Sequence, residues 1–229
     1  MKDITLRTLE TLEKADLILA EDTRHASKLL NHYNIKVPLM AHHKFNEHKI
    51  VETICGKILS GQTIVMISDA GTPGISDPGF LLTRLCIEKG IEVETLPGAT
   101  ALIPALVNSG LPCDRFCFEG FLPQKKGRNK RLSNLADETR TMIFYESPFR
   151  LVKALKEMAE HFGAEREASV SRELSKMFEE NVRGQLSFLI EHFTENQPKG
   201  EIVIVVAGKR GKSFEVDAND LSLGQTTFK

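Results

Sequence analysis

The chain has 229 residues, enough for one large or two small domains, and its 41% hydrophobic and 27% charged residues are ordinary for a globular protein. Nothing approaches the roughly 18 consecutive apolar residues of a membrane helix, and no cationic, apolar signal peptide opens the sequence, so we expect a cytoplasmic protein. Because the formal net charge is only −1, a polyanionic partner would have to be met by a local basic patch rather than by the overall field.

The first half of the chain alternates predicted strands with predicted helices. Apolar residues at helical spacing predict the helices, and β-branched apolar runs predict the strands. The expected elements are a helix over 4–14, a strand over 15–20, a helix from 24 to 30, a helix over 46–59, a strand over 63–67, a helix over 77–89, a strand over 92–96 and a helix over 101–108. Asp77 and Pro78 are a favourable N-cap and first helical position. This alternation is typical of an α/β domain with a mainly parallel sheet.

The second half has less regular spacing between its strands, which indicates a mixed sheet. A turn-rich segment at 110–114 marks the best domain boundary. Strands are expected over 115–119, 141–145, 167–173 and 201–207, and helices over 129–137, 149–162 and 187–194. We therefore expect α/β domains over 1–111 and 112–208, followed by a polar tail over 209–229.

The cysteines show no pattern of disulfides or of a zinc site. There are four of them, Cys55, Cys86, Cys113 and Cys117. The last two are spaced like one half of a metal site, but no second ligand pair accompanies them. Free thiols in a reducing compartment are therefore expected.

The loop over 68–79 is the most informative part of the sequence. It follows the predicted strand over 63–67, and its glycines can adopt positive φ and let a ligand approach the backbone, while its prolines stiffen it. In open α/β sheets, loops at the carboxyl ends of strands form the ligand crevice. The alternative is an ordinary strand-to-helix turn, although such turns need only about 2–6 residues.

This loop does not match the common nucleotide-binding motifs. The chain has neither the GxxxxGK[ST] pattern nor a GxGxxG pattern at its first strand–helix turn. The loop also contains no Lys or Arg, so a polyphosphate is not the expected ligand. A small, partly cationic or zwitterionic cofactor suits it better.

Three further segments could carry chemistry. Over 97–101, small residues and the Thr100 hydroxyl could form a second ligand contact, or only a plain turn. After the first strand, Glu21 or Asp22 could face the crevice as a proton acceptor, although these charges could instead pair with Arg24. His43 lies in a stretch rich in acid–base groups, but adjacent histidines on a strand point in opposite directions, so no metal is expected.

Residues 124–131 form the main basic run of this nearly neutral chain. Its cations are Lys125, Lys126, Arg128, Lys130 and Arg131. Such a run is usually a solvated loop. Contact with RNA is the alternative, because this run is the strongest local patch for a polyanion.

Together these segments resemble the tetrapyrrole methylase superfamily, the class III S-adenosylmethionine-dependent methyltransferases. The resemblance is closest to the branch that methylates a cytidine ribose 2′-hydroxyl in 16S ribosomal RNA. The matching segments cover about residues 3–207 in the family's order, at 20–24, 45–47, 68–79, 97–101, 119–123, 144–148, 172–174 and 200–201. The run DAGTPGISDPG, which begins at Asp69, is highly specific to that branch.

The resemblance implies a two-domain α/β fold with a mainly parallel N-terminal sheet, a mixed C-terminal sheet and S-adenosylmethionine in the cleft between them. It also implies a homodimer whose partner is 16S ribosomal RNA or the small ribosomal subunit. Cofactor contacts are implied at Asp69, Ala70, Gly71, Ile75, Thr100, Ala101 and Tyr145.

The same resemblance places the reaction at the end of the first strand. Glu21 lies where some tetrapyrrole-methylating relatives carry a catalytic Asp, so it is the first candidate for the proton acceptor. The alternatives are Asp22, His43 and Glu146. Two other functions stay open: methylation of a tetrapyrrole or other small molecule, and a non-catalytic role as a ribosome-binding factor.

The sequence departs from this family at its start. The RNA branch begins with a strand and a loop reading approximately Pro-Thr-Pro-x-Gly-Asn, before the segment that matches residues 1–5. That strand is internal to the family's first sheet, so a sheet without it should expose backbone edges. We expect either an in-frame stretch upstream of Met1 that supplies the strand or an impaired short form.

Overall fold

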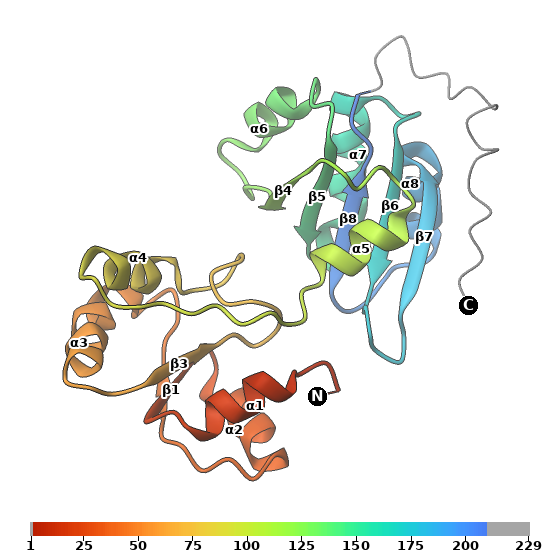
Figure 1. Cartoon of the computed structure of the whole chain (residues 1–229). Coiled ribbons are helices and arrows are strands. Elements are labelled where there is room, and N and C mark those ends of the chain that lie inside the picture. The colour runs from red at the N-terminus through yellow and green to blue at the C-terminus, as the bar shows by residue number, and fades with distance from the viewer. Residues whose placement is uncertain (1, 210–229) are drawn as a thin grey trace, which may run out of the picture. The chain divides into compact units, whose positions relative to one another are not determined.

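The computed structural model describes residues 2–209, which form two compact units that divide between Pro104 and Ala105 (Figure 1). Each unit has its own sheet and its own apolar core. The division falls inside α5 (Leu102–Ser109), whereas the sequence placed the domain boundary at residue 111. Apart from its first residue, the expected polar tail lies outside the described part of the chain.

The first unit is built on a parallel sheet of three strands in the order β2-β1-β3. Their bounds are β1 Leu17–Ala20, β2 Leu39–Ala41 and β3 Ile64–Ile67. Ala20 pairs with both Ala41 and Ile67, so the carboxyl ends of all three strands align at one edge of the sheet. The sequence predicted β1 and β3 but not β2, which is too short to show a period of its own.

Helices cover both faces of this sheet. They are α1 Leu6–Glu13, α2 Thr23–His32, α3 Glu47–Leu59 and α4 Phe80–Glu88. Because successive strand residues point to opposite faces, Leu17 and Leu19 pack with Ile54 of α3 and Leu82 of α4, while Ile18 packs in a separate cluster. That cluster contains Leu12 of α1 and Leu30 of α2.

The cysteines at the α3–α4 contact are free thiols, as predicted. The sulfurs of Cys55 and Cys86 are buried and lie 3.8 Å apart. Burial raises the pKa of the Cys86 thiol to about 11, so it stays protonated and unreactive at neutral pH.

Two predictions about the first unit are wrong. The helix expected over 77–89 begins at Phe80, because Gly79 takes φ 137° and Glu47 Oε1 accepts the backbone N–H groups of Gly79 and Leu81. The Glu47 carboxylate therefore caps the start of α4, the role that the sequence assigned to Asp77. The strand expected over 92–96 is irregular, because no described strand lies beside it to complete a ladder; β3 is an edge of the sheet.

The second unit contains a mixed five-stranded sheet in the order β4-β5-β8-β6-β7, which confirms the predicted mixed sheet. Its strands are β4 Phe116–Phe121, β5 Thr141–Glu146, β6 Glu167–Arg172, β7 Glu180–Gln185 and β8 Ile202–Val206. β8 is antiparallel to both β5 and β6, and β4 is parallel to β5, so β4, β5 and β6 end at the same edge. The sequence missed β7, a polar edge strand.

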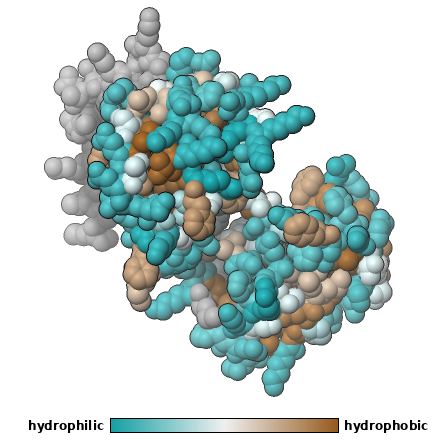
Figure 2. All heavy atoms as spheres, turned by 180° about the vertical axis from the view of Figure 1, so that it is seen from behind, coloured by the Kyte–Doolittle hydropathy of each residue, from teal (hydrophilic) through white to brown (hydrophobic). Residues whose placement is uncertain are grey.

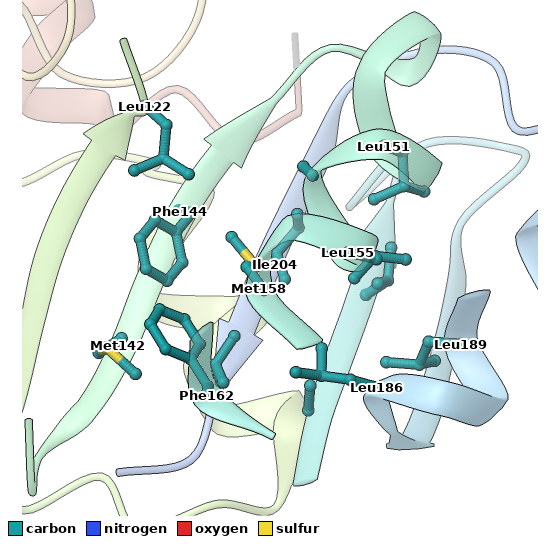
Figure 3. Packing of buried hydrophobic residues seen from close by; sticks show 14 of the residues in the cluster. Leu122, Met142, Phe144, Leu151, Leu155, Met158, Phe162, Leu186, Leu189 and Ile204 are labelled. Atoms are coloured by element: carbon teal, nitrogen blue, oxygen red, sulfur yellow. The ribbon is translucent and has the colours of Figure 1, made fainter. Parts of the chain in front are cut away.

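One large apolar core supports this sheet (Figure 3). The helices of the unit are α6 Arg128–Leu135, α7 Leu151–Phe162 and α8 Leu186–Glu195, and a short 3-10 helix, Pro148–Arg150, precedes α7. Leu155 and Met158 of α7 point toward Phe144 of β5 and Ile204 of β8. Burying such side chains contributes roughly 1.5–3 kcal/mol each.

On the face that Figure 2 shows, both units are mainly hydrophilic, with exposed apolar residues among the polar ones. Within residues 2–209, no helix combines the length and the apolar character that crossing a lipid bilayer requires.

Candidate functional site

The carboxyl ends of β1, β2 and β3 bring the predicted polar residues of the first unit to one edge. Glu21 and Asp22 follow β1, His43 follows β2, and Asp69 follows β3. The backbone N–H of Asp22 donates to Asp69 Oδ1 at 3.2 Å. The expected proton-acceptor segment and the expected cofactor loop are therefore in direct contact.

The two adjacent carboxylates after β1 differ in their surroundings. Asp22 caps α2 by accepting the Arg24 N–H at 2.8 Å, and its carboxylate also forms an ion pair with the Arg24 guanidinium. These hydrogen bonds hold the pKa of Asp22 well below its usual range, which makes it a poor proton acceptor. Glu21 is half-buried, and within the described chain its carboxylate has no recorded hydrogen bond or ion pair.

His25 is a polar residue of this edge that the sequence did not single out. It lies on the first turn of α2, and its Nδ1 is 3.4 Å from Asp69 Oδ2. The Asp69 carboxylate therefore contacts both the backbone of Asp22, just after β1, and the exposed imidazole of His25. The sequence held a signal for it, because His25 comes three residues after the N-cap Asp22. A residue at that position lies on the first turn of the helix and therefore close to the strand end that the cap follows.

The two histidines after β2 have unsatisfied ring nitrogens. His42 is buried, and neither of its ring nitrogens has a partner among the described residues. Burial lowers the pKa of His42, so the ring is neutral near pH 7. His43 is held by its backbone, because its N–H donates to Asn46 Oδ1 at 2.8 Å, while its Nδ1 is buried without a partner in the described chain.

The loop after β3 is ordered by its own hydrogen bonds. The Ser68 hydroxyl donates to the carbonyls of Ala70 at 3.2 Å and Gly71 at 3.0 Å. Further along, the Gly74 N–H donates to the Pro78 carbonyl at 3.1 Å. Gly71 takes φ 80°, and a Cβ built on it would meet nothing within 4 Å, so its backbone is open to a ligand.

The groups that this loop offers fit S-adenosylmethionine. Asp69 supplies a partly exposed carboxylate, Ala70 and Gly71 supply exposed backbone, and Ile75 supplies an exposed apolar side chain. No basic residue lies in the loop to repel a sulfonium. A carboxylate beside open backbone and apolar surface is a donor set for a cationic, zwitterionic ligand with apolar parts.

The other expected cofactor contacts lie in different places. Thr100 and Ala101 are half-buried and directly precede α5, with no recorded hydrogen bond to the loop after β3. Tyr145 belongs to the second unit, at the end of β5. Its ring makes edge contacts with Phe118 and Phe121, at centroid distances of 4.9 and 5.6 Å.

The basic run after β4 separates into exposed and buried cations. Lys125, Lys126 and Lys130 are exposed, and Arg131 is half-exposed beside Glu119. Arg128 departs from the expectation of a phosphate contact. It is only 6% exposed because its guanidinium lies between the carboxylates of Glu157 and Glu146.

Arg128 is the centre of a buried ion network. Its Nε donates to Glu157 at 2.5 Å, its Nη2 lies 3.5 Å from Glu146, and its Nη1 donates to the Pro123 carbonyl at 3.3 Å. Glu146 also accepts from Arg150 at 3.0 Å. Glu146, a lesser candidate for the proton acceptor, is therefore buried between two arginines.

Within residues 2–209, no group of three or more His, Cys, Asp or Glu could hold a metal ion.

A family model described as Tetrapyrrole (Corrin/Porphyrin) Methylases matches residues 1–189. A protein of Synechocystis named "Ribosomal RNA small subunit methyltransferase I" is 51% identical over 207 residues, which are 90% of this chain and 74% of that protein. Proteins with the same name from Haemophilus influenzae and Thermotoga maritima are 50% and 44% identical; the alignments cover 91% of this chain and 75% and 94% of theirs.

Solved structures share the fold at much lower sequence identity. Cobalt precorrin-4 methyltransferase CbiF superposes with a TM-score of 0.64 at 18% identity, covering 90% of this chain and 89% of its own. The methyltransferase CobJ gives 0.64 at 20% identity, with coverage of 92% and 91%. These likenesses confirm the predicted fold class.

Proposed function

The chain belongs to the tetrapyrrole (corrin/porphyrin) methylase family, and from this premise we propose that it methylates a cytidine ribose 2′-hydroxyl of 16S ribosomal RNA. The observation that carries the proposal is its 44–51% identity to relatives named as small-subunit ribosomal RNA methyltransferases. The structures with tetrapyrrole-related names are only 18–20% identical and support the fold alone. Methylation of a small molecule is therefore the less favoured function.

S-adenosylmethionine is the methyl donor, and it supplies a methyl group already activated by a sulfonium. We assign its binding to Asp69, Ala70, Gly71, Ile75, Thr100, Ala101 and Tyr145. The contribution of these residues is alignment, since holding two reactants in line converts a bimolecular encounter into a unimolecular step.

The proton of the attacking hydroxyl needs an acceptor, and Glu21 is the favoured one. It lies at the strand edge beside the Asp22–Asp69 contact, and within the described residues no cation neutralises it. Asp22 is bound to Arg24, and Glu146 is buried between arginines, which leaves His43 as the remaining alternative. A base near a ribose hydroxyl typically contributes 10²–10⁴-fold to the rate.

The direct test of this function is transfer of radiolabelled methyl from S-adenosylmethionine. Purified small ribosomal subunits and naked 16S rRNA should be compared side by side, with a tetrapyrrole precursor as a third acceptor. Alkali cleaves RNA through the free 2′-hydroxyl, so a 2′-O-methyl group blocks cleavage of the adjacent phosphodiester bond. Label recovered in an alkali-resistant dinucleotide would therefore identify ribose methylation. Label only in the tetrapyrrole would overturn the proposal, and ribosome binding without transfer would favour the non-catalytic factor.

The open backbone at Gly71 should be a determinant of cofactor binding. We expect Gly71→Val to weaken S-adenosylmethionine binding at least tenfold, about 1.4 kcal/mol, because a branched side chain would occupy the approach to the backbone. Calorimetric titration measures this directly.

Gly61 provides the matched control for this substitution. It also has positive φ, at 97°, and a Cβ there would also meet nothing within 4 Å, but it lies before β3 rather than after it. Gly61→Val carries the same backbone strain and should leave cofactor affinity unchanged. Equal losses in both variants would remove the loop from the site.

The exposed lysines of the basic run should bind RNA phosphates. Lys125→Ala together with Lys126→Ala should weaken RNA binding and flatten the slope of log affinity against log salt by roughly 1.5 units, at 0.7–0.9 per lost phosphate contact. Filter binding across a salt series measures this slope. Arg128 is left intact because it is buried.

The control pair is Lys14 and Lys36, two exposed lysines that precede β1 and β2. Alanine at both positions removes the same charge but should leave the slope as in the wild type. A slope that changes equally in the two double variants would mean that the basic run is only a solvated loop.

Location in the cytoplasm and assembly as a homodimer are also part of the proposal. The homodimer rests on the family resemblance, and the cytoplasmic location rests on the free cysteines and on the relatives named as ribosomal RNA methyltransferases. The small ribosomal subunit is assigned as the macromolecular partner on the strength of the relatives' names.

A further inference from the structure

Three loops of the second unit leave its sheet at the same edge. Strands β4, β5 and β6 run in the same direction, so the segments that follow them emerge together. Glu146, the last residue of β5, and Arg172, the last of β6, both pair with Ile202 of the strand between them. Since neighbouring strands lie ≈ 4.7–4.9 Å apart, these two loops begin about 10 Å from one another.

Large apolar side chains stand exposed on these loops. Phe149, just after β5, is 93% exposed, and Phe178, after β6, is 64% exposed. Met177 is 90% exposed, and Phe121 at the end of β4 is also exposed. We call these four residues the strand-end aromatic surface. A gathering of this kind at one edge, unlike a single exposed side chain, indicates a binding surface.

Unpaired positive charge lies beside this surface on the β4 side. Lys125 and Lys126 are exposed and lie in the loop after β4, with no recorded acidic partner among the described residues. Arg150, next to Phe149, binds Glu146 through Nε and is partly exposed. Lys176 is different, because Glu173 and Glu201 already pair with it. Because Arg150 and Lys176 are both paired with carboxylates, the charge that complements a polyanion is that of Lys125 and Lys126 on the loop after β4.

We infer that the strand-end aromatic surface is a stacking platform for unpaired bases of the RNA substrate, with Phe149 and Phe178 beneath the bases and Lys125 and Lys126 on the phosphates. Aromatic rings beside cations are how proteins hold single-stranded nucleic acid, because every base has a face to stack and every nucleotide a charge to neutralise. A ribose in a folded subunit reaches a methyltransferase site only when its nucleotide is unstacked. The platform would keep the neighbouring bases in this unstacked conformation. This inference rests on the proposed function.

The absence of tryptophan from the chain allows a direct test. Phe149→Trp introduces one fluorophore at an exposed position. A single-stranded oligoribonucleotide of 16S rRNA sequence should quench its emission saturably, because a stacked base contacts the indole. The same strand annealed into a duplex should quench far less, since its bases are already paired.

Phe188 is the matched control position. It is 48% exposed on α8, which follows the end of β7, and that end pairs with Glu167 at the start of β6, so Phe188 lies at the opposite edge of the sheet. Phe188→Trp should not be quenched. Equal quenching of both reporters would overturn the inference. A blue-shifted Phe149→Trp emission that responds to protein concentration and not to RNA would show that a second copy covers the surface instead.

A kinetic comparison separates this inference from the proposed function. Phe149→Ala should raise KM for small subunits about tenfold, the typical loss of one stacked base, with kcat and S-adenosylmethionine affinity unchanged. Phe149→Tyr should restore KM, which a merely structural role would not predict. If the wild type methylates RNA and Phe149→Ala matches it in KM, the platform is wrong while the function stands. If the wild type transfers no methyl to RNA, the function itself fails.

Discussion

Arg128→Ala should lower the free energy of unfolding by about 3–5 kcal/mol, the typical cost of removing one member of a buried ion pair. The arginine is 6% exposed and lies between Glu157 and Glu146, which is itself only 3% exposed. Without the guanidinium, these carboxylates would remain in a low-dielectric interior, and Arg150 and Lys153 are the cations that pair with them elsewhere in residues 2–209. Urea denaturation followed by circular dichroism measures the change.

Arg131 offers the matched control, three residues later on α6. Its guanidinium is 52% exposed, although its partner Glu119 is only 10% exposed, so water can replace more of the lost contact and Arg131→Ala should cost less than Arg128→Ala, about 1 kcal/mol. Arg128→Lys should also destabilise, because an ammonium cannot reproduce the fork that reaches both carboxylates and the Pro123 carbonyl. Equal midpoints for Arg128→Ala and Arg131→Ala would contradict the assignment of Arg128 to the core.

Glu21→Gln should lower the rate of methyl transfer ~10²-fold or more while S-adenosylmethionine affinity stays at the wild-type value. Glutamine keeps the shape of the side chain and removes its basicity. Single-turnover transfer to small subunits measures the chemical step, and calorimetry measures cofactor affinity.

Asp22→Asn is the comparison that locates the base. The Asp22 carboxylate already accepts hydrogen bonds from the Arg24 backbone and guanidinium, so its loss should weaken the start of α2 rather than the chemistry. A dead Asp22→Asn with an active Glu21→Gln would shift the assignment by one residue. Full activity in both variants would move the base to His43, the remaining alternative at the same edge.

The buried position of Arg128 changes how the basic run is understood. The run contains five cations close together in sequence, and charge alone cannot separate those that face solvent from one that faces the core. The structure assigns Arg128 to holding the loop after β4 against α7 through Glu157. The neighbouring Lys125 and Lys126 are left exposed, where they can meet phosphates.

Much of the fold could be predicted because it depends on local periodicity. Helices α1, α3, α7 and α8 and strands β1, β3, β5 and β8 lie within a few residues of their expected ranges. Each combines an apolar repeat with clear turn residues at its ends, which is the strongest signal a single sequence carries. The short β2 and the polar β7 lack such a repeat, and only their pairing with β1 and β6 makes them strands.

The sequence by itself determined the family, the α/β class and the loop over 68–79, because each depends on the kinds of residue at fixed local spacing. Only the tertiary structure decided that Glu47 caps α4, that His25 faces Asp69 and that Arg128 is buried, and that residues 92–96 form no strand. Those outcomes depend on charged partners from 18 to 44 positions away, or on a missing neighbour in the sheet. Hydrogen bonds and desolvation act between groups that folding brings together, whatever their separation along the chain.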